Sequence, residues 1–392
     1  MFFGSQHKYM LHEICTRNIS SKMFDRLADR AIERPIPSEH FPKHDKLADY
    51  EVEIFAPHVD VTRAKVAFGD RAIPKLRKEL RNRNILVVKQ ALCSLLDMAH
   101  DPEKAVQIIS LNVIPWLEKL MKSDDSFIRK TVLQILRVIS DQPRGKCSIC
   151  KTPAILENIS LLLSDPETIV RKEAAYTLLV LASRHLVVKT LVEENFINII
   201  VYHLEKEINE DIMTYLLETL ELLLDLNEIA HINCLKINGC NLAAFLENPN
   251  PRIRAKTAAV LAQLFIHQLG KEQAVQHEAD IMKMLTICLD DEDEIVKINA
   301  SAALMFGLTT TPAKLHALNL KLLPRLLHYT QISNCPSLQR NCIKALTNLA
   351  EAPVNRAKLL KVVDFLQNTD CNGNKDIENH LETLVNTILW QP

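Results

Sequence analysis

The chain has 392 residues, and its 47 basic and 48 acidic side chains give a formal net charge of −1 at pH 7. This balance excludes binding to nucleic acid or to an anionic membrane through the overall charge of the protein, so a charged partner would have to meet a local patch. Aromatic residues make up only 5% of the chain and there are only 7 glycines, a composition that favours helices and predicts an all-α fold.

Residues 1–56 come first and lie outside any repeat. Prolines at 35, 37 and 42 follow a run of apolar residues at helical spacing, which predicts an amphipathic helix and then an irregular N-terminal arm. The apolar stripe consists of Ile19, Met23, Phe24, Leu27, Ala28, Ala31 and Ile32. Acidic residues are spread through this arm, which argues against a targeting peptide. We expect the arm to dock either on this chain or on a neighbouring protein. Residues 57–81 are expected to form a partial repeat that caps the array.

One helical pattern recurs seven times between residues 82 and 368. Each copy has an apolar anchor, apolar or small residues at positions +4 and +11 counted from it, and a leucine at +8. The seven pairs of anchor and leucine are Val88/Leu96, Ile128/Leu136, Val170/Leu178, Ile212/Leu220, Ile253/Leu261, Val296/Leu304 and Leu338/Leu346. The anchors recur about every 42 residues, and a steady period in this range is typical of a solenoid. We therefore expect the leucine at +8 to lie in the core of every repeat.

Two shorter helical patterns lie between successive copies, for example residues 103–110 and 113–120. Three helices in a repeat of about 42 residues favour an armadillo array over a two-helix HEAT array, although the two classes overlap. The predicted fold is therefore an all-α armadillo-repeat solenoid, wound as a right-handed superhelix. Residues 369–392 are expected to form a polar loop and a capping helix whose outer face stays polar.

Motifs for catalysis, cofactors and metals are not found in the sequence. The 14 histidines form no HExxH pair, and no glycine-rich loop precedes a Lys-Ser or Lys-Thr pair. Cys147 and Cys150 form a single CxxC without further ligands at metal spacing, so we interpret it as incidental spacing in a helix. The chain is expected to be a non-enzymatic, soluble, cytosolic protein with reduced cysteines, several of them buried, such as Cys93, Cys288 and Cys342. No cofactor, metal, small-molecule substrate, nucleic acid or membrane is expected as a partner.

Basic residues directly follow five of the seven anchors, namely Lys89, Arg129, Arg171, Arg254 and Lys297. Acidic residues precede most of these anchors, which suggests an internal ladder of ion pairs between repeats. The alternative is a surface for an acidic partner. Exposed pairs of this kind would each contribute about 0.2 to 1 kcal/mol.

Position +10 decides whether the array resembles peptide-binding armadillo proteins of the importin-α type, in which an asparagine there grips the backbone of the ligand. Only the seventh copy keeps the asparagine; the seven residues are Met98, Val138, Val180, Leu222, Gln263, Phe306 and Asn348. The inner face is thus expected to be mostly apolar, either as part of the core or as a groove for an amphipathic helix.

Four polar residues at the C-terminal end of the array are candidates for partner binding: Asn299, Asn341, Lys344 and Asn348. The last three share one face of the seventh helix, and Asn299 extends this face into the preceding repeat. Asparagine can both donate to and accept from the backbone of a partner, whereas an ordinary solvated end would account for the same polarity.

Four stretches of the sequence are similar to the radial spoke head protein 14 homologue family of motile cilia and flagella. They are residues 64–80 (AKVAFGDRAIPKLRKEL), 100–103 (HDPE), 299–306 (NASAALMF) and 344–356 (KALTNLAEAPVNR). The resemblance runs from about Asp60 to the C-terminus and does not cover residues 1–56. It implies a non-enzymatic scaffold of the axonemal radial spoke, the assembly that relays signals from the central pair to the dynein motors. Its partners would be other radial spoke proteins. The alternative function is a soluble armadillo adaptor that binds peptides or helices in transport or signalling.

Overall fold

The computed structural model describes residues 69–225, 227–237, 239–276, 280–332, 335–369, 371 and 373–390. All the regular structure in these ranges is helical. The predicted N-terminal arm, 1–56, lies outside the described residues, and the limits of the predicted capping segment stay a prediction because its first residues, 57–68, also lie outside them. None of the helices in the described ranges is long and apolar enough to cross a lipid bilayer.

Within the described ranges, eight long helices alternate with pairs of short ones. The long helices are α4 (Ile85–Ala99), α7 (Ser126–Ser140), α10 (Thr168–Ala182), α13 (Glu210–Leu224), α15 (Pro251–Leu264), α18 (Glu294–Gly307), α21 (Pro336–Ala350) and α24 (Lys375–Leu389). The short helices are η2 (Gly69–Arg71), α3 (Ala72–Glu79), α5 (Pro102–Ser110), α6 (Ile114–Leu120), α8 (Pro143–Cys150), α9 (Pro153–Leu162), α11 (His185–Glu193), α12 (Phe196–Leu204), α14 (Glu228–Lys236), η3 (Gly239–Glu247), α16 (Gln268–Gln276), α17 (Ile281–Cys288), α19 (Thr311–Asn319), α20 (Leu322–Ile332), α22 (Pro353–Leu360) and α23 (Val363–Gln367).

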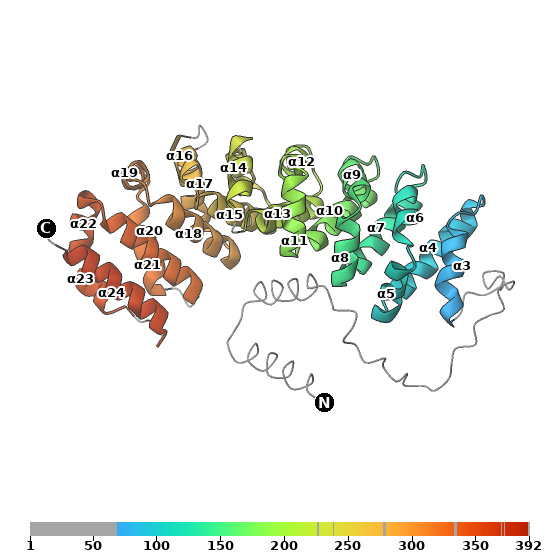
Figure 1. Cartoon of the computed structure of the whole chain (residues 1–392). Helices are drawn as coiled ribbons and strands as arrows, with labels where there is room; N and C mark the ends of the chain where they lie inside the picture. The colour runs from blue at the N-terminus through green and yellow to red at the C-terminus, as the bar shows by residue number, and fades with distance from the viewer. Residues whose placement is uncertain are drawn as a thin grey trace, which may run out of the picture. The chain divides into compact units, whose positions relative to one another are not determined.

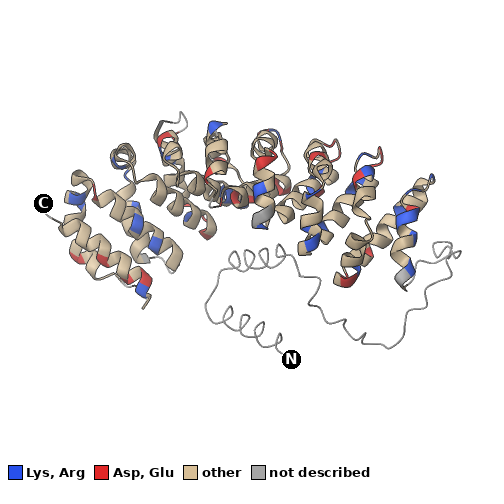
Figure 2. Ribbon diagram, viewed as in Figure 1, with Lys and Arg blue, Asp and Glu red and all other residues tan. Residues whose placement is uncertain are grey.

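The chain divides into two compact units, residues 1–190 and 191–392, with the boundary inside α11. In the first unit α4, α7 and α10 pack in series (Figure 1). In the second unit α13, α15, α18, α21 and α24 do the same (Figure 1). Basic and acidic residues are interspersed along the helices of each unit (Figure 2), in keeping with the near-neutral charge of the chain.

Six of the eight long helices in the described ranges begin where an asparagine or aspartate caps the first turn; the N-cap residues of α10 and α21, Glu167 and Cys335, form no such bond. The side chains of Asn84, Asp125 and Asp293 accept hydrogen bonds from backbone N–H groups two residues further on, and Asn209, Asn250 and Asn374 do the same. Such caps satisfy N–H groups that have no partner inside the helix. The sequence therefore fixes where these helices start through short polar residues between apolar runs.

The predicted apolar stripe forms the core of the repeats. From the second copy to the seventh, the anchor and the residues at +4, +8 and +11 are all buried. Full burial of an aliphatic side chain stabilises the fold by about 1.5 to 3 kcal/mol, so this stripe is the main source of stability in each repeat. The prediction that the leucine at +8 is buried is confirmed in six of the seven copies.

The first copy departs from the predicted pattern at position +8. Its anchor Val88 and the residues at +4 and +11, Leu92 and Ala99, are buried as predicted. At +8, however, Leu96 is only half-buried, and the preceding residue Leu95 is fully buried instead. The N-cap of α4, Asn84, stands four positions before the anchor, whereas the N-cap stands three positions before it in the second to seventh copies. The prediction for Leu96 is therefore wrong, and so is the prediction that Cys93 is buried, because Cys93 is exposed.

An eighth copy of the long helix follows the seven predicted ones. In α24 the N-cap is Asn374, and Ile377, Leu381, Val385 and Ile388 occupy the anchor, +4, +8 and +11 positions, all buried. The capping helix predicted at the C-terminus is thus built like the other long helices. Its exposed outer face is polar and consists of Glu378, Asn379, Glu382, Thr383 and Asn386.

Two glycines allow the chain to turn closely after a long helix. A Cβ atom on Gly145 of α8 would lie 2.1 Å from the carbonyl oxygen of Ile139, and one on Gly270 of α16 would lie 2.2 Å from that of Leu264. Both partners are backbone atoms of the preceding long helix, so only glycine fits without moving the backbone.

Candidate partner-binding surface

The four residues expected to bind a partner lie on two neighbouring helices, α18 and α21. Asn299 is at position +3 of α18, and Asn341 is at the same position of α21; Lys344 and Asn348 follow on α21 at +6 and +10. Asn341 is buried, whereas the other three are half-buried. The structure therefore brings the four residues onto adjacent helices, but it does not leave all of them open to a partner.

The three asparagine amides bond to the preceding long helix. Nδ2 of Asn299 donates to the carbonyl oxygen of Ala255 at 2.9 Å, and Nδ2 of Asn348 donates to that of Met305 at 2.8 Å. Nδ2 of Asn341 donates to the carbonyl oxygen of Ile298 at 3.2 Å and to Oγ of Ser301 at 3.1 Å. These amides hold α18 on α15 and α21 on α18.

Lys344 lies in a group of charged side chains between α21 and α24. Arg340 pairs with Asp376 at 3.6 Å, and His380 lies 3.5 Å from the same carboxylate. Partial burial lowers the pKa of His380, and the positive charge of Lys344 lowers it further, against the opposing effect of Asp376. Lys344 itself forms no ion pair within the described ranges, so its charge is available to a partner.

Three of the five basic residues after the anchors form ion pairs with the following repeat. Arg129 binds Asp165 through two hydrogen bonds of 2.7 and 2.9 Å, and Lys89 lies 2.5 Å from Asp125. In the second unit Arg254 binds Asp291 in the same two-point manner. For these three bases the internal ladder is confirmed, and the alternative of a surface for an acidic partner no longer applies to them.

The guanidinium groups of this ladder also bind the loop before their own helix. Nη1 of Arg129 donates to the carbonyl oxygens of Ser123 and Asp124, each at 2.8 Å. Nη1 of Arg254 donates in the same way to Asn248 and Pro249. Arginine can do this because its planar fork offers five donors, so one side chain fastens two loops at once.

Lys256 of α15 forms ion pairs with two of the acidic residues of α13. Its Nζ lies 3.3 Å from Glu218 and 3.2 Å from Glu221. Burial lowers the pKa of Lys256, but the two carboxylates outweigh it and leave the pKa raised overall. The ammonium group therefore stays charged and links α15 to α13.

The inner positions at +10 are mostly apolar, as expected. Met98, the residue at +10 in the first copy, is half-buried. Val138 is buried, whereas Val180, Leu222 and Phe306 are half-buried. These positions therefore contribute to the core and also present apolar surface between the helices. Asn348 provides the asparagine of the last copy, and its amide is already bonded to Met305.

The CxxC pair lies on α8 in an apolar environment. Burial raises the pKa of the Cys150 thiol to about 12, so the thiolate that a metal or redox site requires is disfavoured. No group of three or more His, Cys, Asp or Glu side chains arranged to hold a metal ion lies within the described residues.

No protein-family model matches the chain. Among solved structures, a computationally designed armadillo repeat protein made for modular peptide recognition aligns with a TM-score of 0.55 and 18% identity, covering 60% of this chain and 99% of its own. The chain has the armadillo-repeat fold. An engineered protein whose crystal structure was determined by the Northeast Structural Genomics Consortium aligns over more of this armadillo array, with a TM-score of 0.59, 19% identity and coverage of 81% of this chain and 88% of its own.

Proposed function

We propose that this armadillo-repeat protein is a non-enzymatic structural scaffold of the radial spoke in the axoneme of motile cilia and flagella. It holds other radial spoke proteins by protein–protein contacts and needs no cofactor or small-molecule substrate. The four sequence stretches that resemble the radial spoke head protein 14 homologue family support this assignment; residues 64–68 of the first stretch lie outside the described residues.

The observation that carries the scaffold role is the continuous set of side-chain links between the long helices of the second unit. Lys256 links α15 to α13, and Asn299 links α18 to α15. Asn341 and Asn348 link α21 to α18, and Arg340 links α24 to α21. Because these side chains link each long helix of the unit to the next one, the surface residues of the unit keep fixed separations, which is what a scaffold requires.

The partner site of this scaffold is proposed at the C-terminal end of the array, around Lys344. Since the amide nitrogens of Asn299 and Asn348 are engaged with the preceding helix, their Oδ1 atoms are the groups left to accept from a partner. Asn341 is buried under this surface and stabilises it through its hydrogen bond from α21 to α18.

Fractionation of motile cilia tests this function. We expect the protein to stay with the axoneme after the membrane is removed with detergent, and to be absent from axonemes that lack radial spokes. Recovery of the protein in the detergent-soluble fraction, or unchanged amounts in spokeless axonemes, would refute the proposal.

An adaptor that binds helices or peptides is the second candidate, and one feature of the first unit favours it. Three successive long helices expose an apolar residue two positions after their N-cap: Leu86 is 63% exposed, Phe127 40% and Ile169 59%. A row of this kind fits the apolar side of an amphipathic helix. Binding of such a helix by protein from the cytosol, with none in the axoneme, would favour the adaptor.

A further inference from the structure

The open face of α24 differs from the same face of every preceding long helix in the second unit. Position +5 is fully buried in α13, α15, α18 and α21, where it is occupied by Leu217, Ala258, Ser301 and Ile343. In α24 this position is Glu382, which is exposed. Position +12 is likewise fully buried in these four helices, whereas Leu389 of α24 is 48% exposed. The face on which a further long helix would pack is thus uncovered.

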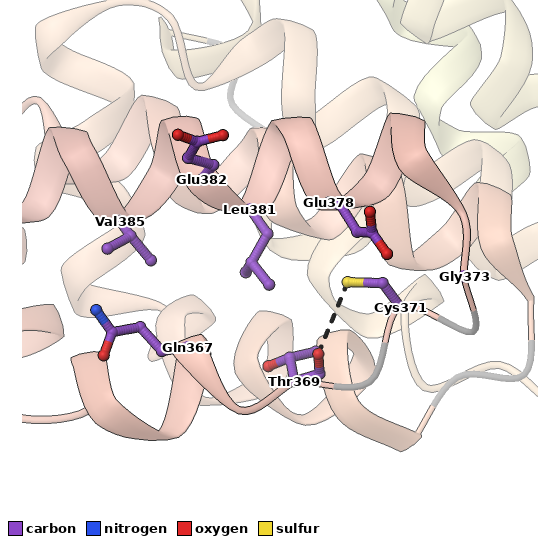
Figure 3. A pocket seen from close by; sticks show the side chains of 8 residues that line it. All are labelled: Gln367, Thr369, Cys371, Gly373, Glu378, Leu381, Glu382 and Val385. Carbon is purple, nitrogen blue, oxygen red and sulfur yellow. Dashed lines mark hydrogen bonds between the residues drawn. The ribbon is translucent and has the colours of Figure 1, made fainter.

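A pocket of about 420 Å³ lies on this face, between α23 and α24. Figure 3 shows Leu381 and Val385 extending from α24 toward Gln367 and the loop that carries Cys371. Glu378 and Glu382 come from the same helix and complete the lining. Leu381 and Val385 are only 7% and 9% exposed, so they form the floor of the pocket. Leu389, which follows Val385 by one turn, is the exposed apolar side chain beyond it.

The charge on this face selects the kind of partner. Within the array, position +1 is basic in α15, and Arg254 there pairs with the acidic loop of the following repeat. In α24 position +1 is Glu378, so this position carries a negative charge instead of a positive one. An element that packs here in the manner of the next repeat would have to bring a basic group to Glu378 and Glu382, together with an apolar strip for Val385 and Leu389.

We propose that the pocket between α23 and α24 is the seat of a basic amphipathic helix from a partner protein, bound where a ninth long helix of the array would lie. An apolar side chain of that helix enters the pocket above Leu381 and Val385, its apolar side covers Leu389, and its basic side pairs with Glu378 and Glu382. This inference rests on the proposed scaffold function, for which it names the chemistry of one partner.

Binding of a synthetic peptide to the full-length chain tests the inference. The probe is a fluorescein-labelled amphipathic peptide of leucine and lysine, as long as α24, and the matched probe replaces every lysine by glutamate. We expect the lysine peptide to bind and the glutamate peptide not to bind. The double variant Glu378→Lys/Glu382→Lys should weaken binding of the lysine peptide by about tenfold or more.

The control variant is Glu205→Lys/Glu247→Lys, because both residues are exposed acids of the same unit outside the pocket. It should bind the lysine peptide like the unsubstituted protein. Equal affinity of the Glu378→Lys/Glu382→Lys variant, or equal binding of both peptides, would overturn the inference. Self-association that this variant abolishes, measured by sedimentation, would also overturn it in favour of a second copy. None of these results depends on whether the protein is found in the axoneme, so failure of the inference is distinct from failure of the proposed function.

Discussion

The guanidinium group of Arg254 donates two hydrogen bonds to the carboxylate of Asp291: Nε lies 2.7 Å from Oδ2 and Nη2 lies 2.8 Å from Oδ1. The two side chains are only 19% and 9% exposed, so water screens the pair weakly. The same arginine binds two carbonyl oxygens before its own helix. This one residue therefore connects two successive repeats.

Replacing Arg254 by alanine should lower the free energy of unfolding by about 2 to 4 kcal/mol, because the largely buried carboxylate of Asp291 loses its partner. Lys297 is the matched control: it occupies the same position in the next repeat and forms no ion pair within the described residues. Lys297→Ala should cost less than about 1 kcal/mol. Urea unfolding of the full chain measures both, and equal losses would contradict the assigned role of Arg254.

The pH dependence of the same pair follows from the hydrogen bonds of Arg254, which lower the pKa of Asp291 below its ordinary value of 3.8. A carboxylate with a lowered pKa in the folded state contributes stability above pH 3.8, and this contribution is lost as the pH falls through the folded value. The Arg254→Ala variant should therefore lose less stability than the unsubstituted protein in this acidic range.

Two adjacent leucines test which one belongs to the core of the first repeat. Leu95→Ala should lower the free energy of unfolding by about 2 to 5 kcal/mol, like Leu304→Ala in the sixth repeat, because both side chains are fully buried. Leu96→Ala should cost clearly less, since Leu96 is only half-buried. Denaturant unfolding of the three variants measures these losses, and a greater loss for Leu96→Ala would make Leu96 the core leucine, as the sequence predicts.

His231 should make the second unit less stable in mild acid. The side chain is 5% exposed and its Nε2 atom has no hydrogen-bond partner. Burial and the nearby His267 lower its pKa below the ordinary value of 6.5, against the opposing effects of the Leu224 carbonyl, Asp225 and Glu228. The folded state therefore binds the proton less readily than the unfolded state, and stability falls as the pH drops below about 6.5.

The variant His231→Leu removes this titrating group. We expect its melting temperature to change less between pH 7 and pH 5.5 than that of the unsubstituted protein, as measured by thermal unfolding. An unchanged pH dependence would show that His231 does not cause the effect.

The buried core could be predicted from the sequence, because buried residues recur at the same positions of each long helix, whatever the connecting short helices contain. Which of Leu95 and Leu96 is buried in α4 could not be predicted, since both satisfy a pattern that requires leucine and they are neighbours on the helix. The eighth long helix was missed as a repeat because Val385 replaces the leucine at +8.

The hydrogen bonds of the asparagines could not be predicted from the sequence, for a different reason. Asn299 and Asn348 bond to residues 44 and 43 positions earlier in the chain, and such distances are set by how neighbouring helices pack. The sequence indicated that these residues share a face, but it could not tell a contact with the preceding helix from a contact with a partner.

Variants of Lys344 and Asn348 test partner binding and stability separately. Lys344→Glu should leave the melting temperature nearly unchanged, since this half-buried side chain forms no ion pair within the described ranges, but it should impair incorporation into spokes. Asn348→Ala should lower the free energy of unfolding by about 0.5 to 1.5 kcal/mol through loss of the bond to Met305. Normal incorporation of a folded Lys344→Glu protein in a cilia rescue assay would rule out this partner surface.

Cryo-electron tomography of axonemes from cells that lack the protein tests the proposed scaffold role most directly. The account predicts that radial spokes are lost or that a defined part of the spoke density is missing, and that expression of the unsubstituted chain restores it. Complete spokes in every position of the axonemal repeat would contradict the assignment of this protein to the radial spoke.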